Sequence, residues 1–314
     1  MSQYDAERHF AVAGTPIKHS LSTVLHMAVF KELGLPWQTA LVDPEDLEGF
    51  QLLIKNMREG SAGYDGANIT IPYKEEAFRL CDELSPVAQR CGAVNTVARV
   101  GGDKLEGHNT DVGGFLDALK SGLKIDTNGL QSAIVCGTGG AARAVATALV
   151  SVGIPRLVIL SRTDNRANQF VTELRQADDQ TQWRSASYED AFTVIGQEEV
   201  FDLCVNATPL GMVDGSPQEL PQGWVAYLKH VRAIFDVVYR RNGLTLLVQW
   251  AHKNGIPATD GLMMLVEQAV SSLVFWGTPA EPEEMRAIMR KALIDEGITR
   301  CAQQPQQQKQ KQIS

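Results

Sequence analysis

Short runs of apolar residues alternate along the chain with longer stretches in which apolar residues recur every three or four positions. The short runs, bounded by Gly, Pro or Asn, predict buried strands, and the longer stretches predict amphipathic helices. Strands that alternate with helices in this way indicate an α/β fold. The expected strands lie at residues 10–13, 37–42, 66–71, 132–136, 157–160, 203–206 and 233–238, and the expected helices lie at residues 22–33, 74–82, 115–122, 141–152, 246–254 and 262–275, with one more beginning at Asp43-Pro44-Glu45-Asp46.

The length of the chain and the order of these elements predict two units. At 314 residues the chain exceeds the size at which one hydrophobic core usually divides. The strand at 132–136, the helix at 141–152 and the strand at 157–160 form a βαβ unit, which is the repeating unit of a doubly wound parallel sheet. We therefore expect a first α/β layer that ends near Asp111 and a Rossmann-type unit after it.

Composition narrows the classes of partner. A net charge of −8 and a pI near 5.3 argue against nucleic acid, because neutralising phosphates requires clustered Lys and Arg. The most apolar stretch, residues 261–276, is interrupted by Glu267 and Gln268 and is shorter than a bilayer span of about 20 residues. It predicts a buried helix and no membrane segment, so small molecules are the expected partners.

Cysteine and histidine usage gives no sign of a metal site. The five cysteines are scattered without a C-x-x-C pair, no H-E-x-x-H pattern occurs, and the histidines do not cluster at ligand spacing. No basic segment followed by an apolar one opens the chain, so we expect no secretion signal and a reducing, cytoplasmic location. Residues 303–312 are almost entirely Gln and Lys, too polar to bury a core, so the tail from 301 to 314 is expected to be disordered.

A glycine-rich turn follows the strand at 132–136 and opens the helix at 141–152. Glycine lets the backbone approach a pyrophosphate, whose charge is stabilised by the unpaired amides and the dipole at the helix start. A tight glycine turn without a ligand would show the same letters, so the position between strand and helix carries the interpretation. The residues that fit G-x-G-x-x-G/A, and that we expect to contact a dinucleotide, are Gly137, Thr138, Gly139, Gly140 and Ala141, followed by Ala142.

The end of the next strand distinguishes NADP from NAD. NAD sites usually carry Asp or Glu there, which binds the ribose 2′-hydroxyl and would repel a 2′-phosphate. This chain has Ser161, Arg162 and Thr163 at that point, and Arg166 follows one helical turn later. Guanidinium groups donate paired hydrogen bonds to phosphate, so we predict NADP, with NAD less favoured. Two surface arginines without a ligand are the alternative.

Further polar clusters occupy predicted turns, where a purely structural loop would not require such chemistry. They are Gly14-Thr15-Pro16-Ile17-Lys18-His19-Ser20-Leu21-Ser22, Gly66-Ala67-Asn68-Ile69-Thr70-Ile71-Pro72-Tyr73-Lys74, Gly92-Ala93-Val94-Asn95-Thr96, Asn109-Thr110-Asp111, Asn206-Ala207-Thr208-Pro209-Leu210-Gly211-Met212, Asp236-Val237-Val238-Tyr239 and Asp260-Gly261-Leu262-Met263-Met264-Leu265-Val266-Glu267-Gln268. In these motifs, and in their order over nearly the whole chain, the sequence resembles shikimate dehydrogenases.

The resemblance implies an architecture and a site. It implies a substrate domain at 1–111, a Rossmann NADP-binding domain at 112–250, and C-terminal helices at 251–300 that pack back on the first domain, with the active site in the cleft between. Ser20 and Ser22 would bind the substrate carboxylate, and Lys74 and Asp111 would flank the reacting carbon. Residues implied to hold the ring hydroxyls are Thr70, Asn95, Asp111, Tyr239 and Gln268, and residues implied at the cofactor besides the fingerprint are Thr208, Val237 and Gly261.

The chemistry of ketone reduction gives a separate reason to assign Lys74. Hydride addition leaves an alkoxide that must receive a proton, and a lysine held by a carboxylate can supply it. The same amine, when neutral, would accept the proton in the reverse direction. The alternative is an exposed lysine in a first helical turn, where its charge opposes the helix dipole. His19, beside the serines, could also be read as a base or a metal ligand, but the other histidines do not cluster with it at ligand spacing, so neither role is favoured.

We therefore expect reversible, NADP-dependent reduction of 3-dehydroshikimate to shikimate by a monomer or homodimer. Departures from the family pattern, close to the carboxylate turn and the nicotinamide end, keep open a paralogue that acts on quinate or an aminated shikimate. The departing positions are Thr23, Met27, Val112, Arg241, Leu244 and Thr245. A methylenetetrahydrofolate dehydrogenase and a non-catalytic NADP-binding regulator are the remaining alternatives. The serine pair argues against the first, and the retention of Lys74 and Asp111 argues against the second.

Overall fold

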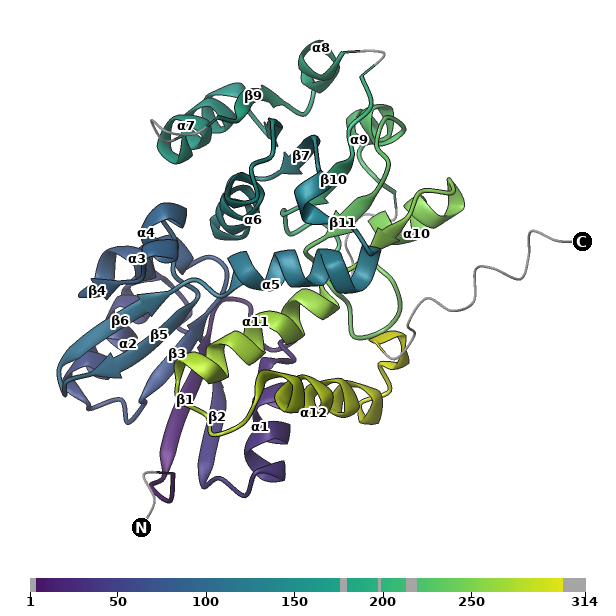
Figure 1. The fold of residues 1–314 in the computed structure, drawn as a ribbon. Helices are drawn as coiled ribbons and strands as arrows, with labels where there is room; N and C mark the ends of the chain where they lie inside the picture. The colour runs from purple at the N-terminus through teal and green to yellow at the C-terminus, as the bar shows by residue number, and fades with distance from the viewer. Residues whose placement is uncertain (1–3, 176–179, 197–198, 213–218, 302–314) are drawn as a thin grey trace, which may run out of the picture.

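The computed structural model describes residues 4–175, 180–196, 199–212 and 219–301. The predicted α/β fold is confirmed, because two six-stranded sheets form two units that are flanked and joined by helices (Figure 1). Residues 302–314, most of the tail expected to be disordered, lie outside the described residues.

The first sheet has mixed strand directions. Its order is β2-β1-β3-β5-β6-β4, with β1 (Arg8–Ala13), β2 (Trp37–Val42) and β3 (Gly66–Ile69) parallel, and with β5 (Thr96–Val100) antiparallel to both β3 and β6 (Lys104–His108). The short strand β4 (Glu83–Leu84) runs parallel to β6 at the edge. The helices that belong to this sheet are α1 (Ser22–Glu32), α2 (Leu47–Glu59), α3 (Lys74–Leu80) and α4 (Pro86–Cys91).

The second sheet is entirely parallel. It contains β7 (Ser132–Cys136), β8 (Arg156–Ser161), β9 (Gln182–Ser187), β10 (Leu203–Asn206), β11 (Ile234–Asp236) and β12 (Ala258–Thr259) in the order β9-β8-β7-β10-β11-β12. This is the 3-2-1-4-5-6 order of a doubly wound dinucleotide-binding sheet. Its helices are α6 (Gly140–Ser151), α7 (Asp164–Leu174), α8 (Ala191–Ile195), α9 (Gln222–Leu228) and α10 (Leu246–Lys253).

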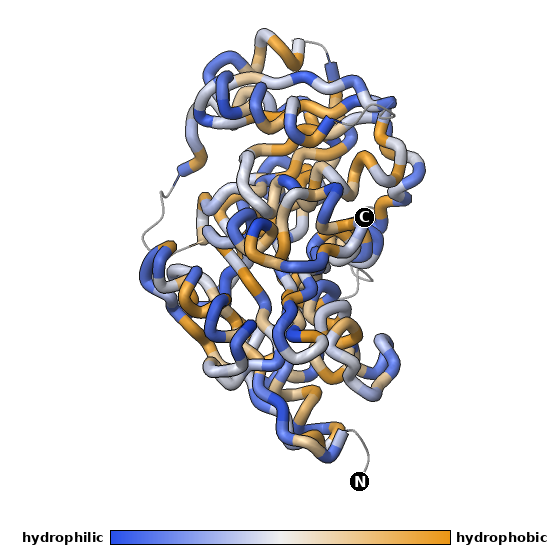
Figure 2. Tube along the Cα trace, turned by 90° about the vertical axis from the view of Figure 1, so that its left-hand side faces the viewer, coloured by the Kyte–Doolittle hydropathy of each residue, from blue (hydrophilic) through white to orange (hydrophobic). Residues whose placement is uncertain are grey.

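Two helices lie between the sheets and connect their cores. Helix α5 (Asp111–Ala118) packs against both α6 and α11 (Leu262–Phe275), and Figure 1 shows α5 and α11 side by side in the middle of the molecule. Met264 of α11 lies in the core of the parallel sheet, whereas Leu265 and Leu273 lie in the core of the mixed sheet. Helix α12 (Pro282–Asp295) packs on α1 and α11, so the chain returns to the first unit. Hydrophobic segments gather inside both units, with hydrophilic segments toward the outside (Figure 2).

The apolar pattern locates most of the predicted elements, but one predicted helix begins earlier than expected. The helix predicted at 115–122 is α5, which starts at Asp111 and continues as a π-helical turn, Leu119–Leu123. The Asn109 side chain explains the early start, because its Oδ1 accepts hydrogen bonds from the N–H groups of Asp111 (3.1 Å) and Val112 (3.3 Å). Short 3-10 helices occur at Thr127–Gly129 and Thr299–Cys301.

Two kinds of feature are absent from the described part of the chain. None of its helices is both long and apolar enough to cross a membrane. The same residues contain no group of three or more His, Cys, Asp or Glu side chains that could hold a metal ion. The apolar stretch predicted to be a buried helix is α11, ten of whose residues are buried.

Candidate active site

A cleft of about 1150 Å³ lies between the two sheets, where the carboxyl ends of their parallel strands meet. The loops that follow β1 and β3 form one wall, and the loops that follow β7, β8, β10 and β11 form the other. Ligands of open α/β sheets usually bind at this edge. The predicted site residues that line the cleft are Ser20, Ser22, Thr70, Lys74, Asn95, Asp111, Gly137, Thr138, Gly139, Gly140, Ala141, Ser161, Arg162, Arg166, Thr208, Val237, Tyr239, Gly261 and Gln268.

The turn after β1 brings Ser20 and Ser22 beside Tyr239. The Leu21 N–H donates to the Tyr239 hydroxyl at 3.4 Å, and the Ser22 N–H donates to Ser20 Oγ at 3.3 Å. Burial raises the pKa of the Tyr239 phenol, so it keeps its proton at neutral pH and remains a donor. The three hydroxyls form an uncharged, donor-rich corner that suits a carboxylate.

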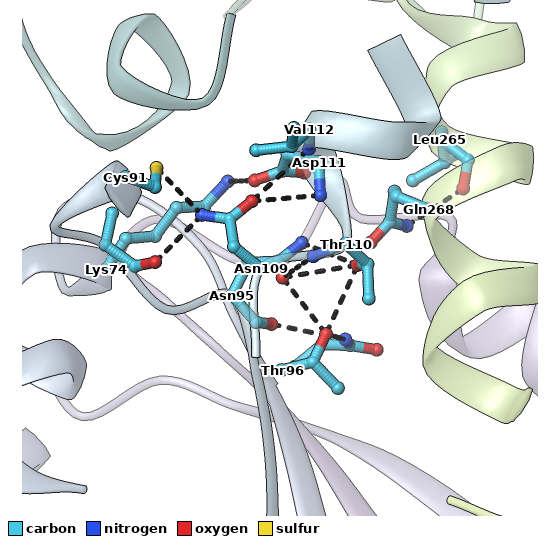
Figure 3. A network of polar contacts seen from close by, with 12 residues as sticks. Lys74, Cys91, Asn95, Thr96, Asn109, Thr110, Asp111, Val112, Leu265 and Gln268 are labelled. Atoms are coloured by element: carbon cyan, nitrogen blue, oxygen red, sulfur yellow. Dashed lines mark hydrogen bonds and ion pairs between the residues drawn. The ribbon is translucent and has the colours of Figure 1, made fainter. Parts of the chain in front are cut away.

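Lys74 and Asp111 form an ion pair inside the cleft. Lys74 Nζ lies 2.7 Å from Asp111 Oδ2, and the two side chains are only 14% and 8% exposed. Lys74 is the first residue of α3 and Asp111 the first residue of α5, so each is placed by a helix start. Asn109 holds the Asp111 turn in place, because its Nδ2 donates to Ala93 O at 2.9 Å and contacts Cys91 Sγ at 3.3 Å (Figure 3).

A buried network of amide and hydroxyl side chains supports the cleft wall that carries Lys74 and Asp111. Asn95 Oδ1 accepts from the Thr110 N–H at 2.7 Å, and Asn95 Nδ2 donates to Thr110 Oγ1 at 2.9 Å (Figure 3). Asn68 Nδ2 donates to Thr96 Oγ1 at 3.0 Å and to Ser272 Oγ at 2.9 Å. All five side chains are buried, so their hydrogen bonds fix the wall in one arrangement.

The glycine loop after β7 presents bare backbone to the cleft. Gly137 has a φ of +117° and approaches Ala207 so closely that a Cβ would lie 2.9 Å from the Ala207 carbonyl oxygen. Gly139 is the N-cap of α6, and no side chain caps this helix start. The first N–H groups of α6 therefore remain available to an anion, which the helix dipole would also stabilise.

Two guanidinium groups follow β8 on the same wall. Arg162 and Arg166 are exposed and line the cleft, and neither has an ion-pair partner among the residues that the structure describes. Tyr188 lies near both, since their charges lower the pKa of its phenol against the larger effect of burial, which raises it. Thr163 lies outside the cleft lining. Its Oγ1 accepts from the Arg166 N–H at 3.4 Å and so caps α7.

A chain of hydrogen bonds joins the loops after β10 and β11. Thr208 Oγ1 donates to Asn206 Oδ1 at 2.6 Å, and Asn206 Nδ2 donates to Asp236 Oδ1 at 2.8 Å. The same Asp236 oxygen accepts from the Val238 N–H at 3.2 Å, next to Tyr239. Burial raises the pKa of Asp236 to about 7.

Comparisons with known proteins show which family has this site. Residues 12–97 match the family described as "Shikimate dehydrogenase substrate binding domain". The chain is 37% identical over 301 residues to the shikimate dehydrogenase (NADP(+)) of Methanopyrus kandleri, covering 93% of this chain and 97% of that protein. It is also 37% identical to the shikimate dehydrogenase (NADP(+)) of Rubrobacter xylanophilus, covering 90% and 94%.

The chain belongs to the shikimate dehydrogenase family. A solved family structure agrees in fold: the shikimate 5-dehydrogenase of Thermus thermophilus, in complex with NADP(H) and shikimate, is 34% identical. It aligns with a TM-score of 0.70 over 91% of this chain and 99% of that one. The resemblance predicted from the sequence motifs is therefore confirmed.

The positions at which this chain departs from the family pattern are not among the residues that line the cleft. Thr245 is buried and caps α10 through the Val248 N–H, Val112 is buried in the core of the parallel sheet, and Arg241 pairs with Glu296 at 2.7 Å. The remaining departures, Thr23, Met27 and Leu244, are also absent from the lining.

Several residues that shape the site carried no predicted role. Asn109 and Thr110 belong to a recognised motif, and Asn68 is an amide in a strand that is otherwise apolar, so each had a signal in the sequence. Ser272 is a lone hydroxyl on the apolar helix α11, and Tyr188 follows β9, a strand that the apolar pattern did not predict. Neither of these two residues has a local signal in the sequence.

Proposed function

We propose that the chain catalyses the NADP-dependent, reversible reduction of 3-dehydroshikimate to shikimate. The observation that carries this proposal is the Lys74–Asp111 ion pair, 2.7 Å long, which faces the cleft between a hydroxyl-rich corner and a bare glycine loop. Family membership supports it, since the relatives named above are shikimate dehydrogenases that use NADP(+).

Neutral donors and one charged pair hold the substrate. The Ser20, Ser22 and Tyr239 hydroxyls donate to its carboxylate, which keeps the ring in one orientation. Thr70, Asn95, Asp111 and Gln268 bind the ring hydroxyls. The Gln268 amide is already oriented, because Nε2 donates to Leu265 O at 2.8 Å.

Lys74 transfers the proton, and Asp111 positions it. Reduction of the ketone places a hydride on carbon and a proton on oxygen, and the hydride is the part that the nicotinamide cofactor supplies when bound. The Lys74 ammonium donates the proton to the oxygen as negative charge develops there, and the neutral amine accepts it in the reverse direction. Asp111 holds the ammonium in place and binds the neighbouring hydroxyl of the ring.

The other wall fits a dinucleotide phosphate. The uncapped start of α6 binds the pyrophosphate through Gly139, Gly140 and Ala141 amides, and the positive φ of Gly137 allows the close approach. Arg162 and Arg166 bind the 2′-phosphate, with Ser161, Thr163 and Thr208 ordering the loops around it. Thr138, Val237 and Gly261 complete the nucleotide wall. The two guanidinium groups favour NADP over NAD.

The same proposal covers the organisation of the chain. The substrate unit ends at about Asp111, and the nucleotide unit continues to β12, beyond residue 250, because β12 belongs to the parallel sheet. Helices α11 and α12 then return to the substrate unit. The protein works in a reducing cytoplasm as a monomer or homodimer; Cys81, Cys91, Cys136 and Cys204 are free thiols, as that location requires.

The test is to follow the absorbance of reduced nicotinamide with purified protein, offering shikimate, quinate and an aminated shikimate in turn, each with NADP and with NAD. Shikimate with NADP should give the highest kcat/KM, and quinate and NAD should each be poorer. Preference for quinate or an aminated shikimate would replace the proposed substrate. Tight NADP binding without turnover of any of these compounds would point to a non-catalytic regulator.

A further inference from the structure

The first turn of α6 touches the side chain of Lys74 across the cleft. A Cβ built on Gly140 would lie 2.8 Å from Lys74 Cβ, 3.1 Å from its Cδ and 3.4 Å from its Cγ. Real Cβ atoms do not approach a neighbouring Cβ to 2.8 Å, so the missing side chain of Gly140 is what makes room for the lysine. Gly139, the adjacent residue, has nothing within 4 Å of its Cβ position.

Lys74 is thereby held on three sides. Its Nζ pairs with Asp111 at 2.7 Å, its backbone oxygen accepts from the Val94 N–H at 2.9 Å, and its aliphatic stem lies against Gly140. The first two contacts come from the substrate unit, and the third comes from the nucleotide loop. The start of α6 is therefore in direct contact with the aliphatic stem that carries the amine.

Arg143, one turn further along α6, makes a second contact between α6 and α3. Its side chain is 11% exposed, its Nε lies 3.6 Å from Glu75 Oε2, and it also pairs with Glu173 of α7. Its Nη1 would lie 3.0 Å from a Cβ on Gly92. One buried arginine thus links α6 to α3, which begins with Lys74.

We propose that Gly140 is a positioning residue for Lys74, in addition to any contact that its amide makes with a phosphate. The hydrogen at its Cα forms the wall against which the lysine stem rests, and Arg143 sets the distance of that wall. This inference rests on the proposed function, because it assigns Gly140 an effect on proton transfer by Lys74.

The test compares Gly140→Ala with Gly139→Ala, two equal additions to the same loop. Gly140→Ala should lower kcat at saturating NADP by about 10-fold to 10²-fold, because it displaces the lysine stem by a substantial fraction of an ångström. Gly139→Ala lies on the exposed backbone that faces the phosphate, so it should raise the Kd for NADP and leave kcat at saturating cofactor less affected.

A double-mutant cycle separates positioning from general disruption. In a Lys74→Ala background the loss caused by Gly140→Ala should shrink to less than about 2-fold, since the amine through which it acts is gone. Equal losses in both backgrounds would overturn the proposal, as would a Gly140→Ala protein with unchanged kcat. Circular dichroism and a thermal melt establish that each variant is folded.

If Gly140→Ala does not fold, Arg143→Lys tests the positioning proposal in its place. It shortens the link to Glu75 and should lower kcat a few-fold at constant Kd for NADP; an unchanged kcat would reject the proposal. The turnover of the wild-type protein distinguishes failure of the positioning proposal from failure of the proposed function. An active wild type with insensitive variants removes only the positioning role, whereas an inactive wild type removes the proposed function.

Discussion

The two walls of the cleft are built in opposite ways. The wall from the mixed sheet contains a buried hydrogen-bond network, in which Asn95 bonds to Thr110 and Thr110 bonds to Ser272. The wall from the parallel sheet offers the uncapped start of α6 and two exposed arginines, Arg162 and Arg166. The first wall therefore presents the Lys74–Asp111 pair and buried neutral hydrogen-bonding groups, whereas the second presents backbone amides and two positive charges.

The sheets explain this difference. In the parallel sheet every strand ends at the cleft, so glycine turns and helix starts collect there. In the mixed sheet the antiparallel pair β5 and β6 places Thr96 opposite His108, which brings Asn95 beside the Asn109-Thr110-Asp111 turn. An antiparallel hairpin can therefore hold buried amide side chains together at the ends of its strands. The corresponding ends of the parallel strands present backbone N–H groups to the cleft instead.

The largest effect should come from removing the charged amine of the Lys74–Asp111 pair. Lys74→Ala should reduce kcat by about 10²-fold or more, the usual cost of losing a general acid or base, with little change in NADP affinity. Stopped-flow and steady-state assays measure the two quantities separately. The matched control is Lys104→Ala, which removes an exposed lysine paired with Glu83. Undiminished turnover would take Lys74 out of the mechanism.

The open wall can be tested through its charge. Arg162→Ala should weaken NADP binding by about 10-fold to 10²-fold, the value of a charge-assisted hydrogen bond, and leave NAD binding almost unchanged. Titration calorimetry with both cofactors gives the comparison. Arg232→Ala, an exposed arginine paired with Asp202, is the control and should alter neither. Equal weakening of both cofactors would contradict the assignment of Arg162 to the 2′-phosphate.

The glycine turn of the parallel unit could be predicted from local sequence, although β9, β12 and the helices α7, α8 and α9 of that unit were not predicted. The strand predicted at 132–136 and its glycine turn are contiguous, so the sequence pattern locates β7 and the start of α6 together. The hairpin of β5 and β6 was not predicted, although Gly101 and Gly102, both at positive φ, form a recognisable turn between its strands. Charged residues on both strands weaken the apolar alternation on which the prediction relied.

The site was predicted as a set of residues, but its contacts were not. Motif resemblance names Lys74, Asp111 and Gly140, yet nothing local relates Gly140 to Lys74, because they lie in different units. Ser272 shows the same limit, since its role comes from the packing of α11 against the first sheet. Side-chain contacts between distant elements are fixed by tertiary packing, which periodicity and motifs do not encode.

The two units also differ in the ionisable group that each buries, which is the acid Asp236 in the parallel sheet and the base His26 beside the mixed sheet. Burial raises the pKa of Asp236 from 3.8 to about 7, so the folded state holds a proton that the unfolded state releases. The resulting stability is present below pH 3.8 and is lost as pH rises toward 7. Between about pH 5 and about pH 8 the loss should be about 2 to 3 kcal/mol, at about 1.4 kcal/mol per pKa unit.

Asp236→Asn should remove this dependence, because the amide oxygen can still accept from Asn206 and Val238 without ionising. Urea unfolding at the two pH values measures it, and Asp103→Asn, an exposed position, should behave as wild type. If the variant retained the wild-type pH dependence, Asp236 would not be the group responsible.

The mixed sheet should show the opposite and slightly smaller response through His26. This imidazole is fully buried against Trp276 at a ring-centroid distance of 5.5 Å, and burial lowers its pKa from 6.5 to about 3. The unfolded chain therefore takes up a proton that the folded one refuses, and stability falls as pH drops from 6.5 toward 3.

From about pH 7 to about pH 5, His26 should cost about 2 kcal/mol, which His26→Leu should abolish in urea unfolding experiments. His9→Leu, at a histidine whose side chain is partly exposed, serves as the control. Acid would then weaken the substrate unit while alkali weakens the nucleotide unit. If His26→Leu and wild type lost equal stability in acid, the acid sensitivity would come from groups outside the α1–Trp276 contact, and the proposed contrast between the two units would fail on that side.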